Sequence, residues 1–208
     1  MYNALIERYP ALAVCGTDIQ AAVNALIACY GQDGKVLLCG NGGSAADCDH
    51  IVGELAKGFL RHRPLSAERK AVMKAANEAL DDAILAKLQG ALPAISLPAI
   101  SVPNTAFCND VDAELVYAQS VLGLGKKGDV LIALSTSGNT ANVAAAVAVA
   151  KALGITVIGL TGKDGGRLAA DADIAIRVPE RETFRIQELH LPVYHYLCAA
   201  VEAHFFQE

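Results

Sequence analysis

One pattern, repeated three times along the chain, constrains the fold more than any other feature. A short apolar run ends in glycine or hydroxyl residues and leads into a longer segment, and these runs are residues 35–39, 129–134 and 156–160. Runs of this length bounded by turn residues are typical of buried strands. Strands that alternate with helices are joined by right-handed crossovers in a parallel sheet. The sequence therefore predicts an α/β fold.

Further elements extend this sheet and its helical layers. Thr17 is expected to cap an N-terminal helix, because apolar residues recur after it at helical spacing and glycines follow. The elements expected in addition to the three strands are helices at 17–30, 44–59, 139–153 and 183–206 and strands at 100–102 and 174–178.

A stretch between residues 64 and 98 is not explained by this pattern. Residues 66–89 are expected to be helical, with one apolar face made of Ala71, Ala75, Leu80, Ile84, Leu85 and Leu88. We interpret the stretch as a helical insertion, a lid or a contact between subunits. No linker, strong repeat or low-complexity tract divides the chain, so residues 1–208 are expected to form a single domain.

The composition agrees with a doubly covered sheet and argues against several classes of protein. Of the 208 residues 53% are hydrophobic and 19% charged, which supplies a sizeable core and makes disorder a poor explanation. A net charge of -5 with no run of lysine and arginine speaks against nucleic acid as a partner. Residues 1–30 lack signal-peptide features and no apolar stretch of about 18 residues stands uninterrupted, so we expect a cytoplasmic protein without membrane contact.

The cysteines and two of the histidines are expected to have no chemical role. The six cysteines include no C-x-x-C pair and several lie in apolar patterns, so they are interpreted as reduced core thiols. His62 lies in a basic stretch before a proline and His204 near the end of the last helix; both are expected to be solvated.

The loop over residues 135–140, Ser-Thr-Ser-Gly-Asn-Thr, lies between a predicted strand and a predicted helix. Helix N-termini at the carboxyl ends of parallel strands offer free N–H groups and a partial positive charge to anions. The hydroxyls of Ser135, Ser137 and Thr140 can donate to phosphate oxygens, and Gly138 permits close approach of the backbone. The alternative is a helix cap whose hydroxyls satisfy only the free amides of the chain itself.

A second loop favours the phosphate interpretation. Gly40-Asn41-Gly42-Gly43-Ser44 follows the first predicted strand in the same way and can close over the same ligand. The loop is not a Walker A motif and lacks the G-x-G-x-x-G spacing of dinucleotide-binding proteins. Two such loops in one sheet predict a sugar-phosphate pocket.

Two predicted helices carry titratable residues at helical spacing. His50 and Glu54 are four residues apart and project from one face, which suits a metal pair or a base with its orienting partner; an ordinary hydrogen-bonded pair is the alternative. On the terminal helix Gln187 and His195 share a broad face, about 80° apart around the axis. Glu188 and His195 align even better, so periodicity alone leaves both pairs open, whereas His190 is interpreted as structural.

With these residues in view, the chain resembles the sugar isomerase (SIS) superfamily and, within it, the phosphoheptose isomerases, which interconvert sedoheptulose 7-phosphate and a heptose 7-phosphate. The matching blocks are residues 40–47, the His50–Glu54 spacing, Asn109-Asp110, residues 135–139 and 160–166, and residues 185–188 with His190 and His195. The resemblance implies a three-layer, flavodoxin-like fold with a five-stranded parallel sheet and helices on both faces. It also implies a homotetramer with active sites at subunit contacts.

The resemblance further assigns roles to residues of this chain. It implies Glu54 and His195 as the acid/base pair and a zinc ion, one per subunit, on His50, Glu54, Gln187 and His195. The substrate-binding residues it implies are Asn41, Gly42, Gly43, Ser44, Asn109, Asp110, Ser135, Thr136, Ser137, Thr140 and Gln187. A carboxylate and an imidazole suffice to move protons between carbon and oxygen, and a metal ion would polarise the carbonyl. Tight binding of zinc by Glu54 would argue against its action as a free base.

We therefore expect a sugar-phosphate aldose-ketose isomerase that converts sedoheptulose 7-phosphate to D-glycero-D-manno-heptose 7-phosphate. Two departures from the family pattern bear on the sugar end of the pocket: the stretch at about 64–98 is longer, and Glu182 stands near a frequent aspartate. The alternatives are an isomerase of another ketose phosphate and a non-catalytic SIS protein that binds a phosphosugar or a replication initiator. The presence of both Glu54 and His195 favours catalysis.

Overall fold

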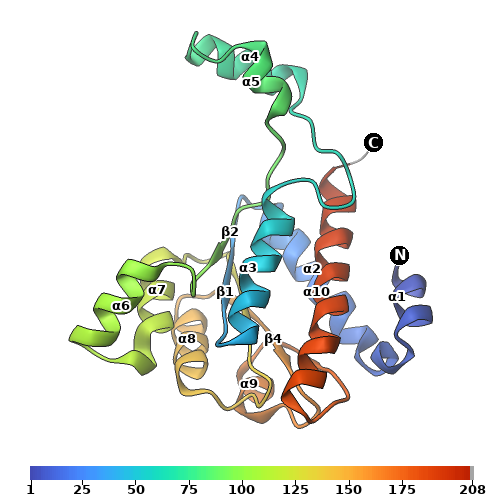
Figure 1. Ribbon diagram of the computed structural model, residues 1–208, viewed down its shortest axis with the longest axis vertical. Helices are drawn as coiled ribbons and strands as arrows, with labels where there is room; N and C mark the ends of the chain where they lie inside the picture. Colours follow the sequence, from blue (N-terminus) through green and yellow to red (C-terminus); the bar gives the residue numbers. More distant parts are fainter. Residues whose placement is uncertain (207–208) are drawn as a thin grey trace.

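The computed structural model describes residues 1–206 and contains a five-stranded sheet, all of whose strands are parallel (Figure 1). The strand order is β2-β1-β3-β4-β5. The strands are β1 (Val36–Cys39), β2 (Ala94–Ser96), β3 (Val130–Leu134), β4 (Thr156–Thr161) and β5 (Ile174–Arg177). The prediction of an α/β fold with five parallel strands is confirmed.

The central strands are buried on both faces because successive side chains point to opposite sides of the sheet. On β1, Val36 and Leu38 pack in one core while Leu37 and Cys39 pack in a second core on the other face. The first core also contains residues of α1 (Tyr2–Arg8), α2 (Gly16–Tyr30), α3 (Gly43–Ala56) and α10 (Thr183–Phe205). The second contains residues of α7 (Val116–Leu124), α8 (Ala141–Ala152) and α9 (Gly166–Asp171). Three layers result, with helices on both faces of the sheet.

One predicted strand is wrong. Residues 100–102 begin a helix, α6 (Ser101–Asp110), which is followed by the 3-10 turn η2 (Ala113–Leu115), and the fifth strand is β2, a few residues earlier. Pro98 lies between β2 and this helix, and Pro103 falls in the first helical turn, where the missing N–H costs no hydrogen bond. Val102 is 76% exposed, which no strand of a doubly covered sheet allows. A three-residue apolar run carries too little periodicity to distinguish these structures.

The predicted helical stretch at 66–89 forms two helices, α4 (Ala67–Ala76) and α5 (Asp82–Lys87), which project away from the sheet (Figure 1). The break arises because the Asn77 side chain accepts a hydrogen bond from the N–H of Ala79, which competes with the helical pattern. Asp81 then caps α5 by accepting from the N–H of Ile84. Of the six residues of the predicted apolar face only Leu85 is buried.

The segment Pro10–Tyr30, which comprises the 3-10 turn η1 (Pro10–Cys15) and α2, is long and apolar enough to cross a membrane by length and composition alone. Ile19, Val23 and Leu26 of this segment are buried in the first core. The helix also packs against α10 (Figure 1). These contacts make α2 part of the core that covers one face of the sheet.

The minor predictions on cysteine and histidine agree with the structure. All six cysteines are free thiols, and all except Cys108 are buried. Burial raises the pKa of the Cys39 thiol to about 12, so this side chain is neutral. His62 and His204 are exposed, and His190 is fully buried, with its pKa lowered by burial to about 4.

Candidate active site

The order of the strands brings the two predicted loops together. β1 and β3 are neighbours, with Cys39 paired to Ala133 near their carboxyl ends. From β1 the chain continues toward β2 at one edge, and from β3 it continues toward β4 and the other edge. Such a reversal of strand order opens a crevice at the carboxyl ends of the strands. Residues 40–44 and 135–140 both emerge at this crevice.

A cavity of about 300 Å³ lies between these loops and the start of α10. Its walls are formed by Asn41, Gly42, Gly43, Ser44, Leu134, Ser135, Thr136, Thr140, Thr183 and Gln187. Eight of the predicted substrate-binding residues are among them. Among these lining residues, Ser44 and Ser135 are almost completely buried.

Two helix N-termini point at this cavity. Gly42 is the N-cap of α3 and Thr140 that of α8, and within residues 1–206 neither helix receives a hydrogen bond from a side-chain cap. In α8, which is 12 residues long, the first-turn N–H groups of residues 141–143 make no hydrogen bond within residues 1–206 and are available to a ligand. In α3, which is 14 residues long, the N–H groups of Ser44 and Ala45 donate to the carbonyl oxygens of Asn41 and Gly42. The combined partial positive charge of the two N-termini suits a phosphate in a chain of net negative charge.

The capping alternative holds for part of the loop at residues 135–140. The Ser135 hydroxyl accepts a hydrogen bond from the Gly138 N–H at 3.1 Å and lies 2.9 Å from the Thr140 hydroxyl. The Ser137 hydroxyl accepts from the N–H of Asn139. These bonds satisfy amides of the loop and shape it, while the N–H groups of α8 remain open. Capping within the loop and anion binding at the helix are thus compatible.

Gly138 is required by the conformation of this loop. Its φ is 68°, in the left-handed region that side chains with a Cβ rarely adopt. A Cβ at this position would also collide with the carbonyl oxygen of Gly165. The glycine therefore allows the β3–α8 loop to pack against the β4–α9 loop.

Residues that the sequence did not reveal form hydrogen bonds to the loop at residues 40–44. The Asn41 and Asn142 side chains form a reciprocal amide pair with N···O distances of 2.8 and 3.1 Å. The Tyr117 hydroxyl donates to the Gly40 carbonyl at 2.8 Å. No motif signals these contacts, because they join residues more than 70 positions apart.

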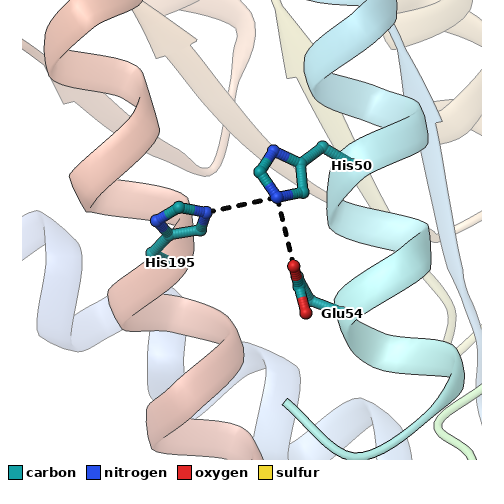
Figure 2. Close-up of side chains that lie close together, drawn as sticks. All are labelled: His50, Glu54 and His195. Atoms are coloured by element: carbon teal, nitrogen blue, oxygen red, sulfur yellow. Dashed lines mark hydrogen bonds and ion pairs between the residues drawn. The ribbon is translucent and has the colours of Figure 1, made fainter. Parts of the chain in front are cut away.

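His50, Glu54 and His195 come together between α3 and α10, further along both helices from the cavity (Figure 2). His50 Nε2 lies 3.1 Å from Glu54 Oε1 and 3.4 Å from His195 Nε2. One ligand atom from each residue lies within 4.8 Å of the others. The three side chains form a group that can hold a metal ion, and a carboxylate and two imidazoles can also exchange protons.

The cluster is half-open to solvent. The Glu54 side chain is 15% exposed and the His50 side chain 42% exposed. The Phe59 ring lies 5.5 Å from the His195 ring, between centroids, and covers it on one side. Burial lowers the pKa of His195, and the nearby His50 lowers it further, while Glu54 opposes them. The lowered pKa favours the neutral form of His195, which is the form that binds a metal or accepts a proton.

On α10, helical periodicity left open whether Gln187 or Glu188 shares a face with His195, and the structure distinguishes the two. Gln187 lines the cavity, whereas Glu188 is exposed and is not among the lining residues. The amide of Gln187 lies so close to Gly43 that a Cβ there would be about 3 Å or less from it. Gln187 thus lies at the wall of the cavity, on the helix that also carries His195 eight residues further along. Its predicted role as a metal ligand stays a prediction.

Three other predicted residues lie away from the cavity walls. Asn109 and Asp110 are exposed at the end of α6, where the Asn109 amide donates to the Asp110 carboxylate. Ser137 lines a neighbouring hollow with Lys163 and Arg181. Their predicted contacts with the substrate stay predictions.

The comparisons with known proteins agree with this architecture. Models of the SIS domain match residues 105–201 and residues 11–96. The phosphoheptose isomerase of Methylibium petroleiphilum is 40% identical over 201 residues, which cover 95% of this chain and 88% of that protein. The phosphoheptose isomerase of Desulfovibrio desulfuricans is 37% identical, with 92% and 79% covered.

Solved structures give the same relationship. The phosphoheptose isomerase GmhA from Neisseria gonorrhoeae superposes with a TM-score of 0.76 at 32% identity, over 97% of this chain and 95% of that one. A phosphoheptose isomerase from Francisella tularensis gives a TM-score of 0.76 at 30% identity, over 96% and 93%. Sequence and fold agree over nearly the whole length, and the chain belongs to the phosphoheptose isomerase family of SIS-domain proteins.

Proposed function

We propose that this protein is a phosphosugar isomerase that converts sedoheptulose 7-phosphate to D-glycero-D-manno-heptose 7-phosphate. The observation that carries the proposal is the position of the His50, Glu54 and His195 cluster beyond an anion cavity on the same two helices. One end of such a site holds a phosphate and the other exchanges protons. Relatives of about 40% identity that carry the name phosphoheptose isomerase support the same reaction.

The spacing along α3 suits a long sugar. Ser44 at the cavity and His50 at the cluster are six residues apart, which corresponds to about 9 Å along a helix axis. In sedoheptulose 7-phosphate the phosphate and the reacting C1 and C2 atoms lie at opposite ends of the chain. An extended seven-carbon chain can bridge the two parts of the site, which supports the heptose over a shorter ketose phosphate.

The reaction needs two proton transfers. A base removes a proton from C1 of the ketose, the resulting enediol shifts its hydroxyl proton from O1 to O2, and a proton returns to C2 to give the aldose. We assign the carbon-bound proton to Glu54 and the protons on oxygen to His195. Glu54 Oε1 faces His50. Oε2 forms an ion pair with Lys57 Nζ at 3.8 Å but accepts no hydrogen bond within residues 1–206, so it can accept a proton.

We assign phosphate binding to the N–H groups and hydroxyls at the cavity, and sugar recognition to polar residues around it. The phosphate residues are Gly42, Gly43, Ser44, Ser135, Ser137 and Thr140. The sugar-recognition residues are Asn41, Asn109, Asp110, Thr136 and Gln187. Ser44, Ser135 and Thr140 support the first assignment because they line the cavity between two uncapped helix N-termini.

Zinc is the cofactor we propose, one per subunit, on His50, Glu54 and His195 with Gln187 as a fourth ligand. Nitrogen and oxygen ligands at about 2.1 Å from a tetrahedral zinc ion lie roughly 3.4 Å from one another. The distances of 3.1 and 3.4 Å from His50 Nε2 to its two neighbours fit this value. When bound, the ion would act as a Lewis acid on the substrate carbonyl.

We also propose a cytoplasmic homotetramer with sites at subunit contacts. Large apolar side chains are exposed on the single chain, among them Val14, Val102, Leu122 and Phe184. The cluster is likewise half-open, and a neighbouring subunit would cover it. Sedimentation equilibrium is expected to give four times the chain mass, and a monomer at micromolar concentration would contradict the assembly.

An NMR assay with a panel of sugars tests the proposed reaction. Sedoheptulose 7-phosphate, fructose 6-phosphate, ribulose 5-phosphate and unphosphorylated sedoheptulose are each incubated with the protein in D2O. We expect aldose signals with deuterium at C2 from the seven-carbon phosphate and none from unphosphorylated sedoheptulose. Faster conversion of a shorter ketose phosphate would reassign the substrate. Binding without turnover would favour the non-catalytic alternative.

The same assay tests the metal. Treatment with EDTA, with elemental analysis to verify the removal, is expected to abolish isomerisation, and added Zn²⁺ should restore it. Full activity in protein shown to be free of metal would remove zinc from the reaction and leave the acid/base assignment in place.

A further inference from the structure

A tyrosine that the sequence did not single out joins two parts of the site. The Tyr194 hydroxyl lies 3.0 Å from His50 Nδ1 and 3.1 Å from Asp47 Oδ1. Tyr194 is on α10, one residue before His195, and its side chain is buried. Asp47 is on α3, three residues before His50, which places both on neighbouring parts of one helix face. A continuous chain of hydrogen bonds thus runs from Asp47 through Tyr194 to His50.

Asp47 has few other partners. Its second carboxylate oxygen, Oδ2, is buried and has no hydrogen-bond partner among residues 1–206. Burial raises the pKa of Asp47, and the hydrogen bond from Tyr194 lowers it. A poorly solvated carboxylate is costly unless it holds a donor firmly. The Tyr194 hydroxyl is the donor that the structure supplies.

When a metal ion occupies the cluster, the ring proton of His50 and the hydroxyl proton of Tyr194 can be placed in only one way. Nε2 of His50, which faces Glu54 and His195, would then use its lone pair for the metal, so the ring proton must be on Nδ1. Nδ1–H donates to the Tyr194 oxygen, and the single Tyr194 hydroxyl proton is directed to Asp47. Only this direction of hydrogen bonding, from His50 to Tyr194 to Asp47, gives each of the three side chains a partner.

We propose that Tyr194 and Asp47 are positioning residues for the metal site, acting through His50. They hold the imidazole in the tautomer and orientation that present Nε2 to the centre of the cluster. Hydrogen-bonded carboxylates and similar groups behind metal-bound histidines fix the tautomer and raise ligand basicity. The inference rests on the metal in the proposed function, but it concerns affinity for the ion and not turnover.

A packing role for Tyr194 is the competing explanation. Its ring lies edge to face against His50 and His195, with centroids 5.5 and 5.0 Å apart. Tyr194→Phe keeps the ring and these contacts and removes only the hydroxyl. Asp47→Asn keeps the shape of the acceptor and removes its charge. The two variants therefore separate hydrogen bonding from packing.

The experiment measures the affinity of EDTA-stripped protein for Zn²⁺ by competition with a chromophoric chelator. Tyr194→Phe is expected to weaken binding by about 10- to 100-fold, the usual effect of losing a hydrogen-bond partner of a metal-bound histidine. Asp47→Asn should weaken it in the same direction. Because Asp47 acts through Tyr194, the double variant should bind no more weakly than Tyr194→Phe alone.

Tyr196→Phe serves as the matched control. Tyr196 lies two residues further along α10, is also buried, and packs against Tyr2, outside the cluster. Its substitution should leave Zn²⁺ affinity unchanged. Circular dichroism of each stripped variant shows whether the fold is retained, and Asp47→Asn decides the question if Tyr194→Phe fails to fold.

Three results would overturn the inference: unchanged affinity in Tyr194→Phe, additive losses in the double variant, or wild-type protein that does not bind Zn²⁺. Failure of the proposed reaction is distinguishable from all three, because the wild-type protein would then bind Zn²⁺ and still convert no sugar phosphate.

Discussion

Replacing Glu54 with glutamine is expected to lower kcat for isomerisation by about 10²- to 10⁴-fold, the contribution of a positioned acid or base. Glutamine keeps the size and polarity of the side chain but cannot accept the proton from carbon. His195→Ala should cause a loss of similar size, because it removes the imidazole that faces the same centre. Rates are measured by NMR with sedoheptulose 7-phosphate at saturating concentration.

The same variants should retain the phosphate end of the site. Glu54 and His195 are absent from the walls of the anion cavity, so titration calorimetry is expected to show nearly wild-type affinity for the sugar phosphate. Zinc content is measured in parallel, because Glu54→Gln also removes a proposed ligand. If the variant keeps its metal and still loses turnover, the loss belongs to proton transfer.

Glu188→Gln is the control for this pair. Glu188 lies on α10 beside Gln187 and has the sequence spacing that made it an alternative partner of His195, but its side chain is exposed. We expect its substitution to leave kcat unchanged. Full turnover in Glu54→Gln or His195→Ala would contradict the acid/base roles, and a large loss in Glu188→Gln would contradict the arrangement of α10.

Replacing Arg63 with methionine is expected to lower the free energy of unfolding by about 3–5 kcal/mol, the usual cost of removing one partner of a buried ion pair. Arg63 and Glu202 are fully buried and joined by a bond of 2.8 Å. Arg63 also donates to the carbonyl oxygens of Leu55 and Glu54, at the last turn of α3. The substitution leaves the buried Glu202 carboxylate without its positively charged partner and two carbonyl oxygens without the Arg63 donor.

Glu202 ties a second segment into the same network. Its carboxylate accepts hydrogen bonds from the N–H groups of Phe59, Leu60 and Arg61. This loop carries the ring that packs against His195. The network thus joins the end of α3 and α10, which carry His50, Glu54 and His195, with the loop whose Phe59 ring packs against His195. Loss of stability should therefore be accompanied by loss of metal affinity.

The measurement is urea denaturation at fixed protein concentration, with Arg69→Met on the exposed face of α4 as control. A surface substitution of this kind is expected to change stability by no more than about 0.5 kcal/mol. If Arg63→Met changed the free energy of unfolding by as little as Arg69→Met, the buried ion pair would contribute little to stability. Arg63→Met/Glu202→Leu should remain destabilised, because the three N–H groups of the loop stay buried without an acceptor.

The pH dependence of stability has a definite sign. Burial alone raises the pKa of Glu202, but the hydrogen bonds from the loop and from Arg63 outweigh it, and the pKa is lowered. A lowered pKa in the folded state gives stability that is present above the pKa of the unfolded chain and lost as the pH falls through the folded value. As the pH is lowered from 5, the free energy of unfolding should therefore fall more in the wild-type protein than in Glu202→Leu.

The sequence alone determined the class of fold and singled out most of the residues that line the cavity between the two loops. Continuous apolar runs at 35–39, 129–134 and 156–160, with turn residues at their ends, are local signals, and the predicted strands formed within a residue of these limits. The glycine- and hydroxyl-rich loops were recognisable because helix N-termini at strand ends have a fixed chemistry. The spacing of His50 and Glu54 was equally local, since one helix places both on one face.

Only the tertiary structure decided the rest. Whether residues 94–96 or 100–102 supply the fifth strand depends on pairing with β1, which no short apolar run reveals. The choice between Gln187 and Glu188 depends on which face of α10 meets α3, and periodicity permits both. Tyr194, Asp47, Arg63 and Glu202 act through partners that lie up to 147 positions away in sequence. Sequence specifies what each helix can present, and the packing of α3 against α10 selects which of those side chains meet.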